Sequence, residues 1–181
     1  MTLSSQIRAG LGLATFFLSV SFAVPVLASD PIQITPNPGE DFAPSISPDG
    51  SFMVYVSDTS GNLDLWMKYL GAGIQPPDRR LTFHSTEDKS PAISPDGKKV
   101  AFVSHRGDPR GDIYILDLQN TNDPVAVVQG KDEDMDPAWS ADQEFIFYAS
   151  RTTQVSIYKK KLKSGEKLLV LKEGGINLST S

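Results

Sequence analysis

The 181-residue sequence contains no cysteine. Disulfide bonds are therefore excluded, and so are thiolate zinc sites and the acylated cysteine of a lipoprotein. Histidine is nearly absent as well, because His84 and His105 are the only two and stand in different sequence contexts. Without cysteine or paired histidines, a zinc site is not expected, and no cofactor is predicted.

Basic residues are too few for a nucleic-acid-binding surface. The chain has 17 Lys and Arg against 22 Asp and Glu, which gives a net charge of −5. Nucleic-acid recognition usually needs a clustered basic face. The sequence also lacks a G-x-S-x-G elbow and a glycine-rich phosphate loop, and these absences favour a non-catalytic protein over an enzyme.

Long hydrophobic runs are missing except near the N-terminus. The run "LGLATFFLSVSFAVPV" at 11–26 follows Arg8, contains Pro25 and leads to small residues ending at Ala28. It is short for a membrane-spanning helix. This layout predicts a secretory signal peptide over residues 1–28 rather than an uncleaved anchor. We therefore expect a periplasmic or extracellular protein with no membrane span after cleavage.

What the sequence does contain is a repeat. Pro44, Pro91 and Pro137 open the segments "PSISPDGSFMVYVS", "PAISPDGKKVAFVS" and "PAWSADQEFIFYAS", spaced 47 and 46 residues apart. Each segment continues into a third run, such as "DLWMKYL" or "DIYILDL", and then into an apolar run before the next proline. Self-similarity at this period is typical of propeller or solenoid architectures.

Each unit of the repeat predicts four short antiparallel strands. The second run of each unit is apolar without alternation, so both of its faces should be buried. Such units match the blades of an all-β protein, a β-propeller, with about three blades present. We place the repeat units at about 30–77, 78–123 and 124–170, with the start of a fourth at 171–181.

The Ser-Pro-Asp-Gly motif is predicted to form a hairpin turn between two strands. Proline presets φ, aspartate tolerates the third position and glycine supplies a left-handed residue, which together make a tight hairpin. The turn-forming residues are Ser47, Pro48, Asp49 and Gly50, and Ser94, Pro95, Asp96 and Gly97. In the third unit Gln143 stands where the glycine should be. It should adopt the left-handed conformation at a cost of about 1 kcal/mol, making that hairpin the loosest.

At these residues the sequence resembles the TolB-like six-bladed propeller family, over residues 30–181. The carrying pattern is P-x-[IW]-S-P-D-G-x-x-[IV]-A-[FY]-x-S followed by D-I-[YW], and the third unit keeps the framework but loses the turn. TolB carries an α/β domain ahead of its propeller, whereas here we expect the first blade to start at about Asp30, directly after the predicted signal peptide. The resemblance implies a binding module that presents loops or a central funnel to a protein or a small ligand.

Three blades are too few to close a ring, since propellers need about four to eight. We expect the chain to be a truncated or N-terminal portion of a longer protein. Uncovered blade faces would then allow self-association. The resemblance extends to propellers of secreted serine hydrolases of the prolyl-oligopeptidase and dipeptidyl-peptidase type, so an alternative is a hydrolase whose catalytic domain is absent from this chain.

Two charged segments are candidate sites. The loop "HRGDPRGD" between the second and third strands of the second unit is the longest, and we place a ligand or partner site at His105, Arg106, Asp108 and Arg110. The acidic run "KDEDMD" at 131–136 lacks the spacing and glycine of a calcium loop. We interpret it as a solvated, self-repelling loop.

Overall fold

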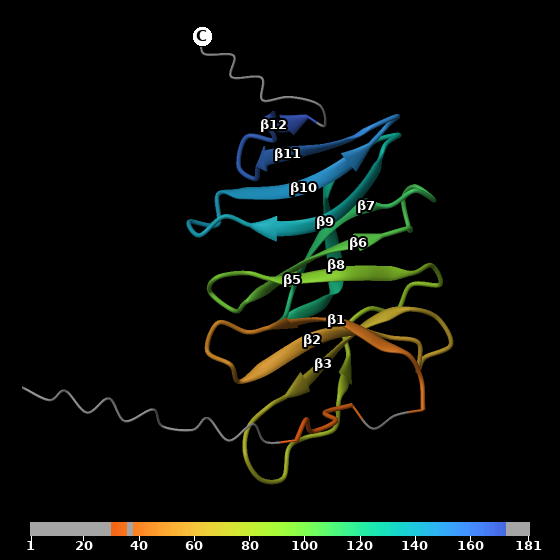
Figure 1. Cartoon of the computed structure of the whole chain (residues 1–181), viewed down its shortest axis with the longest axis vertical. Helices are drawn as coiled ribbons and strands as arrows, with labels where there is room; N and C mark the ends of the chain where they lie inside the picture. Colours follow the sequence, from red (N-terminus) through yellow and green to blue (C-terminus); the bar gives the residue numbers. More distant parts are fainter. Residues whose placement is uncertain (1–29, 36–37, 173–181) are drawn as a thin grey trace, which may run out of the picture. The chain divides into compact units, whose positions relative to one another are not determined.

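A computed structural model describes residues 30–35 and 38–172. The predicted signal peptide at 1–28 and the chain after residue 172 lie outside these residues. Within the compact unit that begins at Thr35, three antiparallel four-stranded sheets follow one another along the chain (Figure 1). The all-β prediction of propeller-type blades is confirmed. No helix among the described residues is long and apolar enough to cross a membrane.

Each sheet, called a blade below, uses four consecutive strands. Blade 1 has the order β1-β2-β3-β4, blade 2 the order β5-β6-β7-β8 and blade 3 the order β9-β10-β11-β12. The strands are β1 Asp41–Ile46, β2 Phe52–Ser57, β3 Asp64–Tyr69, β4 Arg79–Arg80, β5 Asp88–Ile93, β6 Lys99–Ser104, β7 Asp112–Asp117, β8 Asn120–Val128, β9 Glu133–Trp139, β10 Phe145–Arg151, β11 Val155–Lys161 and β12 Lys167–Lys172.

The fourth strand of each blade shows where the boundaries of the sheets differ from those of the sequence repeat. β4 pairs with β3 and β8 pairs with β7, so each fourth strand belongs to the sheet before it. The repeat boundaries at 77/78 and 123/124 instead fall before β4 and inside β8. The earlier apolar run "IQIT" at 32–35 forms no strand, and Ile32 is 84% exposed.

Blades pack face to face through their second and third strands. Val54, Val56, Val100 and Phe102 are fully buried in a core shared by blades 1 and 2. A second core between blades 2 and 3 contains Ala101, Val103, Ile113, Ile146 and Tyr148. Because β6 contributes alternate residues to both cores, it is buried on both faces as the unbroken apolar run predicts.

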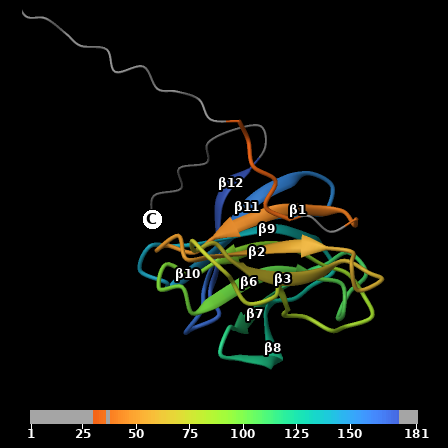
Figure 2. The ribbon, with the colours of Figure 1, turned by 90° about the horizontal axis from the view of Figure 1, so that it is seen from below.

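The first strands of neighbouring blades also meet. β1 contacts β5, and β5 contacts β9 (Figures 1 and 2). The Ile93 N–H donates to Ser45 Oγ over 3.0 Å, and the Trp139 indole N–H donates to the Ala92 carbonyl over 2.8 Å. The blades are therefore joined at their first strands by hydrogen bonds as well as by apolar packing.

The hairpin turns have one architecture in all three blades. In blade 1, Ser47 Oγ donates to Asp49 Oδ1 over 2.7 Å and accepts from the Phe52 N–H over 3.0 Å. The same bonds recur around Ser94 and Ser140. The last turn residue is left-handed each time, with φ of 72° at Gly50, 71° at Gly97 and 61° at Gln143. The left-handed prediction for Gln143 is confirmed, and the looseness of its hairpin stays a prediction.

A second left-handed position repeats in every blade. The residue before the aligned proline has φ of 50° at Ala43, 49° at Ser90 and 51° at Asp136. Each lies where the pairing of the first strand with the second shifts register. Each conformation costs about 1–2 kcal/mol for a non-glycine residue. The first strand of each blade therefore has a β-bulge at the residue before the aligned proline, and the strand bends there.

The acidic run corrects one interpretation. Residues 133–136 are not a solvated loop, because they open strand β9. Asp134 pairs with Ser150 across the sheet and is only 2% exposed. Asp134 is the one buried acidic side chain of this run among the described residues, and sheet pairing overrides the repulsion expected from the run.

Candidate functional site

Buried carboxylates gather where the first strand of a blade begins and its second strand ends. In blade 2, Asp88, Ser104 and Asp112 pair across the three strands, and none is more than 2% exposed. Burial raises the pKa of Asp112, and its Oδ1 accepts from the Gly130 N–H over 3.2 Å. Such a group needs compensation, because a buried charge without a partner is costly.

Arg106, one of the predicted site residues, supplies that compensation. Its guanidinium donates to both carboxylate oxygens of Asp88, over 3.2 and 2.9 Å, and to Ser104 Oγ over 2.8 Å. The guanidinium carbon also lies 5.0 Å from the ring centroid of Tyr114. Arg106 is therefore committed to holding its own blade together and is not free to bind a partner.

The other predicted residues of this loop lie outside that cluster. Asp108 and Arg110 form an ion pair with each other at 3.0 Å, and half of the Arg110 side chain is exposed. His105 Nδ1 lies 3.7 Å from Glu87 Oε2. His105 and Arg110 also line a cavity of about 390 Å³ between this loop and β9, whereas Arg106 and Asp108 do not. Of the four predicted residues, Arg106 is structural and Asp108 pairs with Arg110, while His105 and the same Arg110 line the cavity.

Blade 3 lacks the arginine that holds Asp88 in blade 2, and Lys167 Nζ lies instead over the rings of Tyr148 and Tyr158, 5.6 and 4.0 Å from their centroids. Asp134 corresponds to Asp88 and Ser150 to Ser104 in the strand pairing. Asp134 Oδ1, Ser150 Oγ and the Tyr148 hydroxyl are buried and have no hydrogen-bond partner among the described residues. Burial raises the pKa of Asp134.

Blade 1 compensates its buried carboxylate differently. Asp64, at the start of β3, is fully buried, and Arg80 of β4 donates to its Oδ2 over 2.7 Å. The Thr82 hydroxyl also donates to Asp64 Oδ1, over 3.3 Å. An arginine therefore neutralises a buried aspartate in blades 1 and 2, although it comes from different strands and loops.

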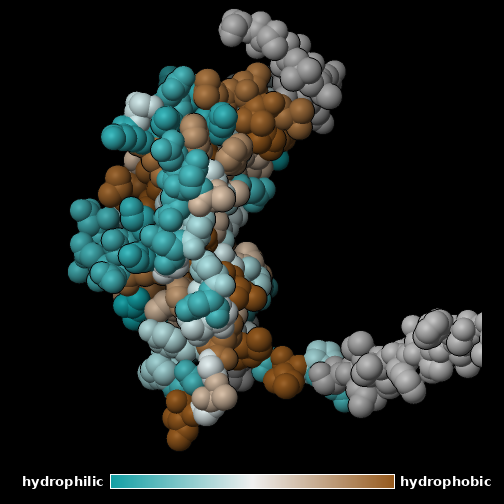
Figure 3. Space-filling model, turned by 90° about the vertical axis from the view of Figure 1, so that its left-hand side faces the viewer, coloured by the Kyte–Doolittle hydropathy of each residue, from teal (hydrophilic) through white to brown (hydrophobic). Residues whose placement is uncertain are grey.

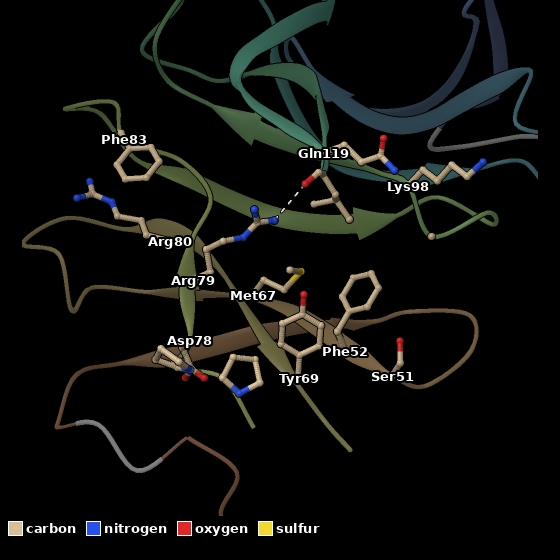
Figure 4. Close-up of a pocket in the computed structure, with 14 residues that line it drawn as sticks. Ser51, Phe52, Met67, Tyr69, Asp78, Arg79, Arg80, Phe83, Lys98 and Gln119 are labelled. Carbon is tan, nitrogen blue, oxygen red and sulfur yellow. Dashed lines mark hydrogen bonds between the residues drawn. The ribbon is translucent and has the colours of Figure 1, made fainter. Parts of the chain in front are cut away.

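A groove of about 950 Å³ runs between blades 1 and 2 near their hairpin turns (Figure 4). Its walls combine apolar side chains with arginine and lysine. These residues do not recur at equivalent positions of the sequence repeat. The lining residues are Ser51, Phe52, Met67, Tyr69, Pro76, Pro77, Asp78, Arg79, Arg80, Phe83, Gly97, Lys98, Leu118 and Gln119.

The groove is held by bonds from both sides. Arg79 donates to the Leu118 carbonyl over 3.1 Å and so ties β4 to the turn after β7 (Figure 4). Asp78 accepts from the Tyr55 hydroxyl over 3.0 Å and pairs with Lys68 at 2.8 Å. Phe83 stays 64% exposed. Polar groups of the wall are thus paired, while aromatic surface is left open.

The edge strand of blade 3 is a further apolar surface. Strand β12 exposes four consecutive apolar residues, and Figure 3 shows hydrophobic side chains gathered at this end. These residues are Leu168, Leu169, Val170 and Leu171, between 38% and 49% exposed. By contrast, Met53 and Tyr55 on the outward face of blade 1 are at most 6% exposed.

The described residues contain no group of three or more His, Asp or Glu side chains placed to hold a metal ion. Sequence reasoning found the 105–110 loop through its length and charge. It missed the groove, because the lining residues come from separate segments with no common motif. It also missed the difference between Asp88 and Asp134, although the loss of an arginine from the third repeat is a visible signal.

No family model and no curated protein matches the sequence. Among solved structures, the chain is similar to TolB from Acinetobacter baumannii, with 25% identity and a TM-score of 0.59, over 72% of this chain and 32% of that one. It is also similar to a putative TolB from Agrobacterium tumefaciens, with 19% identity and a TM-score of 0.65, over 76% of this chain and 50% of that one.

The chain is also similar in structure to an enzyme. A puromycin-hydrolyzing peptidase from Mycobacterium tuberculosis matches with 14% identity and a TM-score of 0.59, over 74% of this chain and 21% of that one. The chain therefore has the fold of TolB-like propeller blades, and it spans between about a third and a half of the length of the two TolB structures.

Proposed function

We propose that this chain is an exported, non-catalytic binding or scaffold module of the TolB-like propeller type. The signal-peptide pattern at 1–28 supports export to the periplasm or the extracellular space. The TolB likeness supports a binding role, since 25% identity to TolB exceeds the 14% identity to the peptidase. The partner would be a protein or a small molecule, and not a nucleic acid.

The groove between blades 1 and 2 is the observation that carries the proposal. Its wall offers the aromatic surfaces of Phe52, Tyr69 and Phe83 next to Arg79 and Arg80. Aromatic residues and arginine are enriched at the energetic centres of protein interfaces. Among the lining residues there is no cysteine or histidine, and the Ser51 hydroxyl donates to the turn carboxylate of Asp49. The chemistry of this groove therefore favours contact over catalysis.

A second candidate is supported by the peptidase likeness. In this version the chain is the propeller portion of a secreted serine hydrolase, and the blades would control access to a catalytic domain absent from this chain. Self-association at the uncovered end of blade 3 is a further proposal, because the apolar side chains of its edge strand β12 stay exposed.

The binding role can be tested by site-specific photo-crosslinking in the native host. A photoreactive residue in place of Phe83 should give a discrete adduct, because that ring is exposed at the groove. The same residue in place of Val125, which is 58% exposed on β8, is the matched control and should give none. Equal adducts from both positions, or none from either, would contradict binding at the groove.

A fluorophosphonate probe of serine hydrolases tests whether this chain is itself catalytic. The purified chain should stay unlabelled under conditions that label a known hydrolase. Labelling at any serine of this chain would overturn the non-catalytic assignment. This measurement does not depend on the crosslinking result, so the two failures can be told apart.

A further inference from the structure

The groove between blades 1 and 2 has a surplus of positive charge. Three of its lining residues are basic, Arg79, Arg80 and Lys98, whereas Asp78 is the one acidic residue among them. Lys68, which does not line the groove, pairs with Asp78 at 2.8 Å and neutralises it. The groove therefore has cations without matching carboxylates of its own.

The two arginines differ in how their charge is used. Arg80 donates to a buried carboxylate of its own blade over 2.7 Å, so it is a structural residue. Arg79 is exposed, and its guanidinium donates to the neutral carbonyl of Leu118 over 3.1 Å. Among the described residues it forms no ion pair with a carboxylate. Arg79 therefore has N–H donors and a full charge left for a ligand.

Lys98 lies on the hairpin turn of blade 2, across the groove from blade 1. The hydrogen bond from Ser94, with help from the Lys98 backbone N–H and side-chain charge, lowers the pKa of Asp96. Lys98 is exposed and forms no ion pair among the described residues. Part of its charge thus acts within the turn, and the rest adds to the positive field of the groove.

Aromatic surface flanks Arg79 on two sides. In Figure 4 its guanidinium lies between Phe83 at one end and Phe52 with Tyr69 at the other. Phe83 and Tyr69 are both exposed, and Phe52 is half-buried. A ligand that contacts all of these side chains has an acidic group between two apolar groups.

The charge of the whole chain narrows the class of ligand. A net charge of −5 disfavours a long polyanion, which the molecule as a whole would repel. A single carboxylate fits better, because the planar fork of a guanidinium matches its geometry and charge-assisted hydrogen bonds are the stronger kind. The apolar contacts come from β2, β3 and the segment after β4. A ligand that spans them is extended, as a peptide segment is.

We propose that the groove binds an extended segment of a protein partner in which an acidic residue stands between apolar or aromatic residues. Arg79 donates to the carboxylate, Phe83 contacts the apolar residue on one side, and Phe52 with Tyr69 contacts the one on the other side. Lys98 adds charge that attracts the segment. This inference rests on the proposed function, because it names the partner chemistry of the same groove.

Isothermal titration calorimetry with capped peptides tests the preference for a carboxylate. The probe is Ser-Leu-Phe-Glu-Phe-Leu-Ser, and its matched control has glutamine in place of the glutamate. The chain should bind the glutamate peptide saturably and the glutamine peptide about tenfold more weakly, because the control loses the charge-assisted hydrogen bonds. Sodium chloride should weaken binding of the glutamate peptide and leave that of the control unchanged.

A charge reversal tests the role of Arg79. Arg79→Glu should bind Ser-Leu-Phe-Lys-Phe-Leu-Ser more tightly than the glutamate peptide, and a merely loosened chain would not show this gain. Lys163→Glu makes the same charge change at an exposed position in the turn between β11 and β12. It is the matched control and should keep the preference for glutamate. Phe83→Ala should weaken the glutamate and glutamine peptides by the same factor.

The crosslinking experiment separates this inference from the proposed function. Arg79→Glu, combined with the photoreactive residue in place of Phe83, should abolish the adduct. An adduct that persists unchanged would overturn the inference and leave the binding role standing. If no adduct forms in the host but the purified chain prefers the glutamate peptide, the proposed function fails and the inference about groove chemistry is supported.

Three outcomes of the titrations would overturn the proposal. One is equal affinity for the glutamate and glutamine peptides, or no binding of either. Another is displacement of the glutamate peptide by an equal concentration of 3-phenylpropionate, which would assign the groove to a small acid. The third is dimerisation of the chain that Arg79→Glu abolishes, which would assign the groove to a second copy.

Discussion

Blades 2 and 3 share strand order, register and turn geometry, yet they differ in how their polar groups are satisfied. Blade 2 has a glycine at the left-handed turn position, φ 71° at Gly97, and an arginine on its buried aspartate. Blade 3 has Gln143 at φ 61° and an aspartate whose Oδ1 has no partner among the described residues. The apolar residues therefore determine the strand order and pairing of a blade. The turn residue and the partner of the buried aspartate can differ without changing that arrangement.

The largest effect should come from giving blade 2 the residue of blade 3. Arg106→Thr leaves the fully buried Asp88 without its cation, and breaking a buried pair in this way costs about 3–5 kcal/mol. The free energy of unfolding from urea titration measures the loss. Arg110→Thr, in the same loop, removes an arginine whose own side chain is half exposed and should leave the midpoint unchanged. Equal loss in both variants would mean that Arg106 acts only through the loop.

A comparison of aromatic side chains on the two second strands should give the next effect. Phe102 is fully buried between blades 1 and 2, so Phe102→Ala should cost about 3–5 kcal/mol of unfolding free energy. Phe147 lies on the outward face of blade 3 and is half-buried, so Phe147→Ala should cost clearly less. Similar losses would indicate that the outward face of blade 3 is covered in solution, as self-association would do.

Exchanging the turn residues should have smaller and opposite effects. Gly97→Ala should destabilise by about 1 kcal/mol, because alanine disfavours positive φ. Its Cβ would lie 3.7 Å from Pro48 Cδ, which is ordinary contact, so the cost is conformational. Gln143→Gly should stabilise blade 3 by a similar amount. Thermal melts of both variants check the signs, and a loss in Gln143→Gly would show that the glutamine side chain stabilises the turn.

The smallest effect concerns pH. Hydrogen bonds from the turn serines lower the pKa of Asp96 and of Asp142, and they lower that of Asp49 to about 2. A carboxylate with a lowered folded-state pKa stabilises the fold above its ordinary value of 3.8, and this contribution is lost as pH falls towards 2. NMR titration should therefore place all three midpoints below 3.8. A midpoint at 3.8 for Asp142 alone would indicate that the third turn is open.

Much of the fold could be predicted because the repeat carries it. The prolines fix the period, the unbroken apolar runs mark strands buried on both faces, and Gly165 marks the hairpin from β11 to β12. The left-handed bulges could not be predicted, because Ala43, Ser90 and Asp136 share no chemistry. Their conformation is imposed by pairing with the second strand, which acts across the sheet and not along the sequence.

The candidate site was predicted less completely. Charge and loop length drew attention to residues 105–110, but they could not show that Arg106 reaches back to Asp88, which is 18 residues earlier. The groove between blades 1 and 2 combines residues from β2, β3, β4 and two distant turns, so only folding brings them together. Pairing of individual polar groups depends on such long-range contacts, whereas the blade pattern depends on local periodicity.

The most direct measurement of the difference between blades 2 and 3 is the pKa of Asp134, obtained by carbon-detected NMR of the chain and of Thr152→Arg. Thr152 follows Ser150 as Arg106 follows Ser104 in blade 2. Burial raises this pKa above the ordinary 3.8 although the charge of Lys167 acts to lower it, and the added guanidinium should bring it down further. A raised pKa in the unmodified chain that falls in Thr152→Arg is the predicted result. A pKa at or below 3.8 in the unmodified chain, unchanged by Thr152→Arg, would contradict the account.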